Sequence, residues 1–333
     1  TISLFTLIFT IFALSNFTDI GEKIFKKKIN LGLDLQGGSY LLLEIDNKPV
    51  IEQKLQNTLL IFRKYFKEKN IKYKNLKIKN DKFIVFDVNS EDIIKTKDIF
   101  TDINSDINPY YIQFKSHQFN LDIKNNTFNL EFSKYGLIQI KNSSLDQALE
   151  IVRRRIDEVG TNEPNILRRG NDRILVELPG LDDPMRIKNL LGKTANLTFR
   201  FIVKSGEEAF GLERLFFEDN LEDDALVSKR IIISGENLLD AQPQMDNQNN
   251  QTVVTFNLDR VGAKRFAKAT KSGIGKRLAI VLDGKIVSAP VIQSAIVGGS
   301  GQITGNFTFQ SATDLALLLR SGALPAPLDI IEE

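Results

Sequence analysis

Residues 144–160, with the sequence SLDQALEIVRRRIDEVG, are the stretch that decides the fold. Ser144 followed by Gln147 fits a capping box at the start of a helix, and Gly160 is a natural C-terminal stop. Apolar residues recur between them at helical spacing and form one face: Leu145, Ala148, Leu149, Val152, Ile156 and Val159. The stretch therefore predicts an amphipathic helix that packs one face into a core.

The segments after this helix predict its partners. Residues 165–168 and 173–178 have the pattern of strands, Asp183-Pro184 begins a second helix, and residues 195–203 form another strand. The order αββαβ is the one that a ferredoxin-like antiparallel sandwich requires. A strand at 302–309, a helix at 311–319 and a strand at 328–332 complete the same sheet. The predicted class is α+β, with a ferredoxin-like base over residues 141–203 and 302–333.

Composition changes at Lys204, and residues 204–301 predict an inserted α/β head subdomain. Asp283-Gly284 lies between two alternating apolar strands, which is a strong hairpin signal. Small flexible residues flank the insertion and are the predicted hinges: Ser205, Gly206, Gly298, Gly299 and Gly301.

Residues 29–140 predict a first α/β part of the base. Strand-like segments precede and follow Gly37-Gly38, where the glycine pair permits a sharp bend. A helix is expected over residues 50–68, strands over 76–79 and 83–88, and a short helix over 90–103. Alternating segments over 110–140 predict further strands.

Residues 1–17, TISLFTLIFTIFALSNF, carry no charge. We expect a transmembrane helix over residues 1–20 that is truncated at its N-terminus; the core of a signal peptide and a buried helix are the alternatives. Lys23, Lys26, Lys27 and Lys28 follow, and the positive-inside rule taken alone would place them in the cytoplasm.

Composition excludes several classes of site. A net charge of +2, with basic residues spread along the chain, gives no reason to expect nucleic acid. The chain has no cysteine and a single histidine, His117, so thiolate and paired-imidazole metal sites are excluded. No segment supplies a nucleophile, a base and an orienting group together. The sequence predicts no catalytic residue, metal or cofactor, and no enzyme. Arg153, Arg154 and Arg155 are interpreted as a salt-bridged outer face of the first helix.

Four segments in this order resemble the SecD/SecF family of protein translocase subunits. They are LGLDLQGG at 31–38, IVRRRIDEVG at 151–160 with DRILVELPG at 172–180, ITG at 303–305, and LLLRSGAL at 317–324. Asp34, Gln36, Gly37 and Gly38 fall in the first of these motifs. Arg320, Ser321 and Gly322 fall in the last, and are expected at the junction between base and membrane helix.

The resemblance implies an accessory subunit of the Sec translocase in the bacterial inner membrane. It implies that residues after about 20 are periplasmic, against the lysine cluster, and that SecF and the SecYEG channel are partners. The head is expected to capture emerging unfolded preprotein. The resemblance also implies coupling to the proton motive force through membrane helices outside this sequence. A porter domain of an RND-type small-molecule transporter and an anchored hydrolase are the alternatives.

Overall fold

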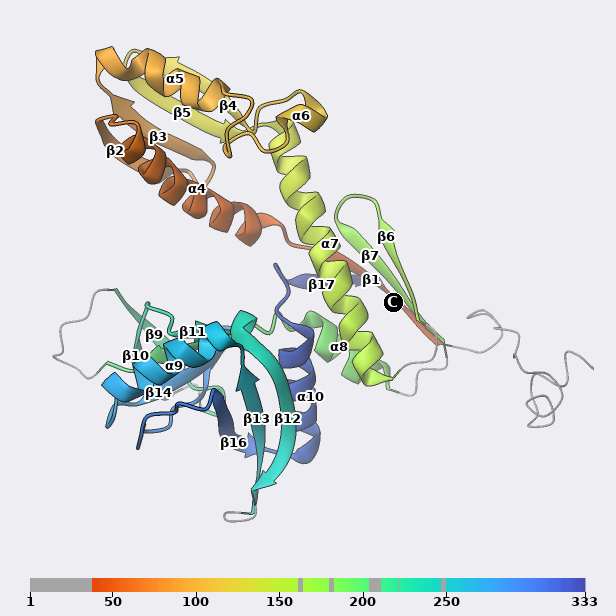
Figure 1. Ribbon diagram of the computed structural model, residues 1–333. Helices are drawn as coiled ribbons and strands as arrows, with labels where there is room; N and C mark the ends of the chain where they lie inside the picture. The colour runs from red at the N-terminus through yellow and green to blue at the C-terminus, as the bar shows by residue number, and fades with distance from the viewer. Residues whose placement is uncertain are drawn as a thin grey trace, which may run out of the picture.

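The computed structural model describes residues 38–160, 164–179, 183–203, 211–220, 222–246 and 250–332. Figure 1 shows three parts arranged along the long helix α7 (Lys134–Val159). We call them the N-lobe (residues 48–132), the base (β1, α7, β6, β7, α8 and β17) and the head (residues 197–321). All pairs of named strands in the described residues are antiparallel. The prediction of a mixed α and β fold with antiparallel sheets is therefore confirmed.

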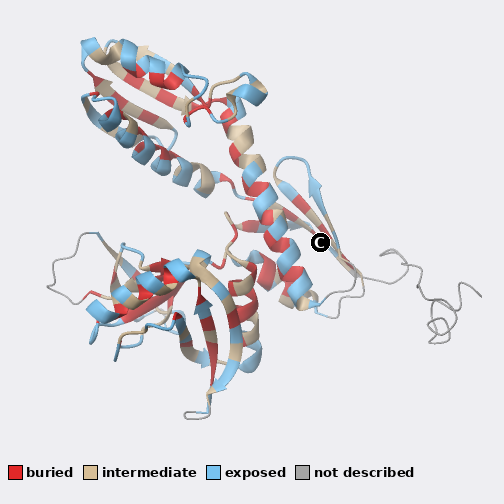
Figure 2. Cartoon of the chain, viewed as in Figure 1, coloured by how far each residue is buried: buried red, intermediate tan, exposed pale blue. Residues whose placement is uncertain are grey.

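The base is a four-stranded sheet covered on one face by two helices. The strand order is β17-β1-β7-β6, and the core lies between this sheet and α7 and α8 (Figure 2). Alternation along β7 places Ile174, Val176 and Leu178 in that core, fully buried. The elements are β1 (Gly38–Ile45), β6 (Asn165–Arg169), β7 (Arg173–Pro179), α8 (Pro184–Gly192) and β17 (Leu328–Glu332).

The predicted sheet of one strand is wrong. Residues 195–203 were expected in the base sheet, but β8 (Leu197–Phe201) pairs with strands of the head, and Leu197 and Phe199 lie in the head core. The central place in the base sheet is taken by β1, between β7 and β17. Both segments alternate apolar and polar residues, so local pattern alone does not assign them to a sheet.

The N-cap of helix α7 lies eleven residues earlier than predicted. Its N-cap is Ser133, whose side chain accepts a hydrogen bond from the Gly136 amide. Ser144, the predicted cap, lies within the helix and is buried. The helix ends where expected, because Gly160 adopts a left-handed conformation with φ of 81°.

The N-lobe has its own sheet and core, so the predicted single part over residues 29–140 is divided. Strand β1 belongs to the base, while residues 48–132 form a sheet of order β2-β3-β5-β4 under α4 and α5. Its core is rich in phenylalanine, including Phe62, Phe86 and Phe128, all fully buried. The elements are α4 (Lys48–Glu68), β2 (Tyr73–Lys79), β3 (Phe83–Val88), a 3₁₀ turn (Ser90–Asp92), α5 (Ile93–Thr101), α6 (Tyr111–Phe114), β4 (Phe119–Lys124) and β5 (Thr127–Phe132).

The head contains sheets of order β11-β8-β14-β15 and β12-β13-β16, with a smaller β10-β9 pair. Helices α9 and α10 complete its core, around Phe199, Phe256 and Phe266. Its other elements are β9 (Leu212–Phe216), β10 (Asp224–Ser228), β11 (Ile233–Ser234), a 3₁₀ turn (Gly235–Asn237), β12 (Leu238–Asp246), β13 (Gln251–Leu258), α9 (Arg260–Ser272), β14 (Leu278–Leu282), β15 (Lys285–Ser288), β16 (Ser300–Phe307) and α10 (Phe309–Ser321). The hairpin at Asp283-Gly284 is confirmed, with φ of 48° and 79°.

The boundaries of the head are wider than the predicted 204–301. Ile303 on β16 and Ala312, Leu315 and Ala316 on α10 share the head core, although residues from 302 onward were expected in the base. Of the strands from residue 302 onward that were expected in the base, only β17 joins the base sheet. Head and base have separate cores, and a small apolar cluster of Leu190, Ala195, Leu317 and Leu318 lies between them.

The predicted membrane anchor, residues 1–20, lies outside the described residues. Among the residues that the structure does describe, no helix is both long and apolar enough to cross a membrane.

Candidate functional site: the junction between base and head

The chain crosses between base and head twice, through segments that lie side by side. Residues 193–196 lead from α8 into β8, and residues 322–327 lead from α10 back to β17. The Leu324 amide donates a hydrogen bond of 2.8 Å to the Thr194 carbonyl, so the two crossings are directly joined. Any change in the angle between head and base must alter the backbone of these two segments.

A buried arginine from α7 holds both crossings. Arg155 is 1% exposed, and its guanidinium donates to the carbonyl oxygens of Leu190 (2.7 Å), Lys193 (2.5 Å), Thr194 (3.3 Å) and Gly322 (3.2 Å). Burial lowers the pKa of Arg155 to about 10, and the nearby Asp283 carboxylate opposes that shift. The side chain is therefore still cationic at neutral pH, where its hydrogen bonds to carbonyl groups are strong.

A carboxylate from the head holds the first crossing from the other side. Asp283, at the tip of the β14–β15 hairpin, accepts hydrogen bonds from the backbone amides of Ala195 (3.1 Å) and Asn196 (2.8 Å) and from the Thr194 hydroxyl. Positive φ at Asp283 and Gly284 forms the tight turn that brings this carboxylate to the crossing. Arg155 and Asp283 thus hold one short segment between the base and the head.

Two ion pairs connect the helices of base and head outside this centre. Arg320 on α10 binds Glu158 on α7 at 2.6 Å and also donates to the Ala241 carbonyl at 2.5 Å. Arg186 on α8 binds Asp314 on α10 at 2.8 Å. These side chains are about one-quarter to one-third exposed, so each pair is partly screened by water.

A cleft of about 740 Å³ lies beside the Arg186–Asp314 pair, between α8 and the head. Its lining is mixed: Met185, Leu315, Leu318 and Phe307 are apolar, and Asn189 and Gln310 are among its polar groups. Met185 is 63% exposed. Charged residues also line it: Asp183, Arg186, Lys193, Glu218, Asp219 and Asp314. A mixed surface of this kind can bind an extended polypeptide through burial of apolar side chains and through hydrogen bonds to its main chain. The residues described here contain no cluster of three or more groups able to hold a metal.

The predicted site residues fall in different places. Asp34, Gln36 and Gly37 lie outside the described residues, and Gly38 opens β1, opposite Pro179. The role of the motif in a bend therefore stays a prediction.

Three of the predicted hinge residues, Gly298, Gly299 and Gly301, are not at the junction. Gly299 and Gly301 lie within the head, close against Ala263 and the Phe256 ring, and Gly298 precedes them on the same loop. The prediction that Gly298–Gly301 leads out of the head is wrong because β16, which begins at Ser300, is part of the head sheet. Ser205 and Gly206 lie outside the described residues.

Arg320, Ser321 and Gly322 do lie at the junction, although they connect the base to the head rather than the base to a membrane helix. Gly322, with φ of 92°, ends α10 and supplies a carbonyl to Arg155. Their predicted contact with a membrane helix is not tested by the described residues.

Sequence reasoning missed the two central residues. Arg155 was interpreted as part of an outer charged face, yet only Arg153 and Arg154 are exposed. The available signal was its spacing: Arg155 is four residues after Ile151 and four before Val159, on the apolar side of α7. Asp283 was interpreted only as a turn residue, and no local pattern indicates its partner 88 residues away.

Comparison with known protein families shows the class of protein to which this chain belongs. Residues 24–48 match the SecD/SecF GG motif, residues 145–204 match the N-terminal P1 domain of the protein translocase subunit SecDF, and residues 213–326 match the SecDF P1 head subdomain. These ranges fall on β1, on the base with the first crossing, and on the head. They define a protein translocase subunit.

Individual relatives agree with this class. The protein translocase subunit SecD of Rickettsia typhi is 40% identical over 96% of this chain, and that of Acetobacter pasteurianus is 39% identical over 92%. The chain spans 62% and 59% of these two relatives. The chain belongs to the SecD family.

The chain is also similar to solved structures of SecDF. The crystal structure of SecDF in its super-membrane-facing form is 26% identical, with a TM-score of 0.55, and covers 99% of this chain and 34% of its own. A structure titled as that of SecDF, a membrane component that enhances protein export, is 33% identical with a TM-score of 0.50. That match covers 65% of this chain and 97% of its own. These matches give no support to the alternative of a small-molecule porter domain.

Proposed function

We propose that this chain is the part of an accessory Sec translocase subunit that captures emerging unfolded preprotein in the cleft between base and head. The observation that carries the proposal is that the head has its own core and is joined to the base by polar contacts around two short crossings. Hydrogen bonds to charged groups contribute about 1.5–3 kcal/mol each, and water can replace a protein partner when a change of angle exposes these groups. A lobe held in this way can change its angle without unfolding.

The cleft supplies the binding surface. An unfolded segment would place apolar side chains against Met185 and Phe307 while its backbone meets the amides of Asn189 and Gln310. Burying one apolar side chain contributes roughly 1.5–3 kcal/mol. One proton crossing a membrane potential of about 100 mV releases about 2.3 kcal/mol. One or two protons per cycle therefore match the energy needed to release one or two such contacts.

The partners follow from the family. SecF and the SecYEG channel are the proposed partners, and the proton-conducting groups are proposed to lie in parts of the relatives that this chain does not span. Residues 1–20 are proposed as a membrane anchor in the bacterial inner membrane, on the basis of the uncharged run over residues 1–17. The described residues are then placed in the periplasm, where an emerging preprotein would meet them.

The base is proposed to be ferredoxin-like. Its elements follow the chain order β1, α7, β6, β7, α8, β17, and its sheet order places the last strand beside the first. This is the βαββαβ arrangement of a split βαβ sandwich, with the N-lobe inserted after β1 and the head inserted after α8. Both insertions leave and return near the same sheet, which makes the base the element that carries the two lobes.

Crosslinking tests the proposal. A photoreactive amino acid is placed at Met185 in the cleft, and a matched one at Val297, which is 79% exposed on the head and outside the cleft lining. In membranes with a secretory preprotein stalled during export, we expect a crosslink from position 185 and little from position 297. Equal yields from both positions, or none from 185, would remove the cleft as a capture site.

A further inference from the structure

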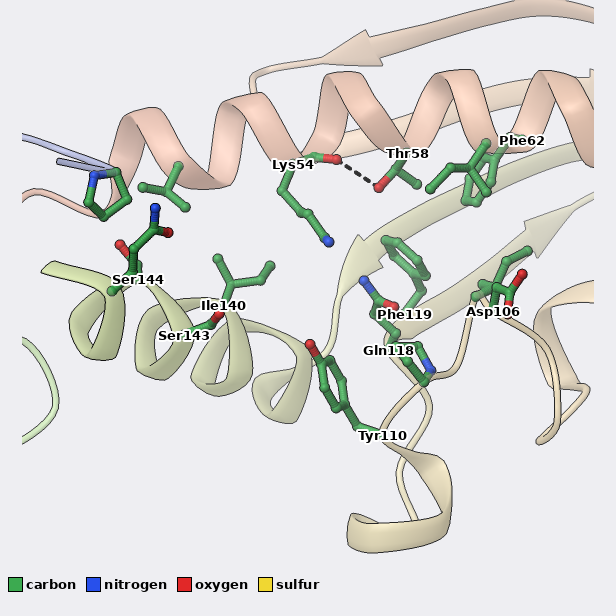
Figure 3. A pocket seen from close by; sticks show the side chains of 16 residues that line it. Lys54, Thr58, Phe62, Asp106, Tyr110, Gln118, Phe119, Ile140, Ser143 and Ser144 are labelled. Atoms are coloured by element: carbon green, nitrogen blue, oxygen red, sulfur yellow. Dashed lines mark hydrogen bonds between the residues drawn. The ribbon is translucent and has the colours of Figure 1, made fainter. Parts of the chain in front are cut away.

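The N-lobe carries a second cleft that the junction does not use. It lies between α4 and α7, has a volume of about 230 Å³, and is closed at one end by Gln118 and Phe119 (Figure 3). The three ranges that match SecDF family models do not include residues 49–144, which hold nearly all of its lining. The family comparison therefore assigns it no role.

The floor of the cleft is apolar. Phe62, Ile107, Phe119 and Ile140 line it and are each less than 9% exposed. Ile140 and Ala148 are neighbours of Ser144 on one face of α7, so a small polar residue interrupts an otherwise apolar stripe. The missing side-chain volume at Ser144 is part of what opens the space between the helices.

One buried hydrogen-bond donor at the cleft has no partner among the described residues. The Ser144 hydroxyl is buried and makes no hydrogen bond, in a side chain that is 3% exposed. The side-chain amide of Gln118 and the ammonium of the exposed Lys54 also line the cleft, and Lys54 forms no ion pair with any residue described. The hydroxyl of Thr58, by contrast, is satisfied by the Lys54 carbonyl at 2.7 Å. Leaving a buried polar group unpaired is unfavourable by about 1–3 kcal/mol, so the Ser144 hydroxyl favours a ligand with an acceptor.

The two charged residues of the lining, Lys54 and Asp106, have opposite signs, and Lys54 is the one that can meet a carboxylate. Asp106, at one end of the lining, hydrogen-bonds to the Tyr65 side chain and keeps its negative charge there. The N-lobe carries fifteen Lys and Arg residues against eleven Asp and Glu, whereas the rest of the chain has an excess of acidic residues. A ligand that combines an aliphatic group with a carboxylate satisfies the apolar floor and Lys54 together.

We propose that the cleft between α4 and α7 binds a short polypeptide segment in which an aliphatic residue stands next to an acidic one. The aliphatic side chain enters the space beside Ser144, the carboxylate meets Lys54, and a main-chain carbonyl accepts from Gln118 or Ser144. This inference rests on the proposed function, because it gives the translocase subunit a second contact with unfolded protein, away from the head.

Peptide binding to the whole chain tests the site. The probes are short fluorescent Gly/Ser peptides with a central Leu-Glu, Leu-Gln or Leu-Lys pair, and the readout is fluorescence anisotropy. We expect the Leu-Glu peptide to bind about tenfold more tightly than Leu-Lys. Lys54→Gln should remove most of that preference, while Lys67→Gln, a change on the exposed face of the same helix, should keep it.

Two further variants separate filling of the cleft from loss of the hydroxyl. Ser144→Val should abolish binding of all three peptides, and Ser144→Ala should weaken binding about threefold to tenfold. Circular dichroism and thermal unfolding establish that each variant is folded. Unchanged binding in both Lys54→Gln and Ser144→Val would overturn the proposal, as would equal binding of hexanoate, which would assign the cleft to a small carboxylate.

Crosslinking distinguishes this site from the junction. A photoreactive residue at Ser143 on the cleft rim should label the stalled preprotein independently of one at Met185. Labelling from Met185 alone would remove the N-lobe site and leave the proposed function standing. Labelling from Ser143 alone would remove the junction cleft instead.

Discussion

The N-lobe and the head are both inserted into the base, but they are joined to it by different physical means. Helix α7 passes without interruption from the N-lobe into the base, with Ile140 in one core and Leu145 in the other. Val50 packs against both cores. The head instead meets the base through directional polar contacts centred on Arg155 and Asp283, with one small apolar cluster. From this difference we propose that the N-lobe moves with the base and that the head is the lobe that changes its orientation.

The largest expected effect comes from removing the arginine that holds both crossings. Arg155→Met leaves four carbonyl groups without their charged donor, and should lower the free energy of unfolding by about 3 kcal/mol or more. Urea denaturation measures the loss, and limited proteolysis should show faster cleavage within residues 193–196. Arg153→Met, which removes an exposed ion pair with Glu150, is the control and should cost less than about 0.5 kcal/mol. A similar small cost for both changes would show that the buried arginine does not hold the junction.

Interrupting helix α7 with a proline should remove the rigid connection between the N-lobe and the base. Asn142→Pro lies between the two cores and cannot donate the helical hydrogen bond, which costs about 3 kcal/mol and kinks the helix. Spin-label distances between the N-lobe and the base should change from one narrow distribution to a broad one. Asn142→Ala keeps the helix and should keep the narrow distribution. A broad distribution of distances in the unmodified protein would contradict the inference that the N-lobe moves with the base.

The smallest expected effect comes from a comparison of two hairpin tips that both carry an aspartate. Asp283 in the head and Asp81 in the N-lobe both have positive φ, which asparagine also tolerates, but only Asp283 binds the crossing. Asp283→Asn should destabilise the closed junction by about 1–2 kcal/mol through loss of the charged acceptor. Asp81→Asn should change stability by less than about 0.5 kcal/mol. Hydrogen exchange at the Ala195 and Asn196 amides is the measurement, and equal protection in both variants would contradict the role of Asp283.

Much of the local structure follows from the sequence. Gly160 ends α7, Asp183-Pro184 begins α8, Asp283-Gly284 forms a hairpin, and Pro325 and Pro327 precede a strand, all as predicted. Each depends on backbone geometry that a few neighbouring residues specify. The start of α7 is the exception. Ser133 and Ser144 both suit an N-cap, and the choice depends on whether residues 134–143 find a core to cover.

The sequence by itself determined the kind of most elements, many of their limits, and, through four short motifs, the SecD family. Residues 111–114 and 134–140 are helical, although strands were predicted there. Only the tertiary structure decided which sheet each strand joins, so that residues 197–201 and 300–307 belong to the head and residues 38–45 to the base. The physical reason is that periodicity records which face of a strand is buried, while its neighbours are chosen by contacts far away in the chain. Arg155 and Asp283 show the same limit, since a buried charge is recognisable only when the carbonyl and amide groups that surround it are in place.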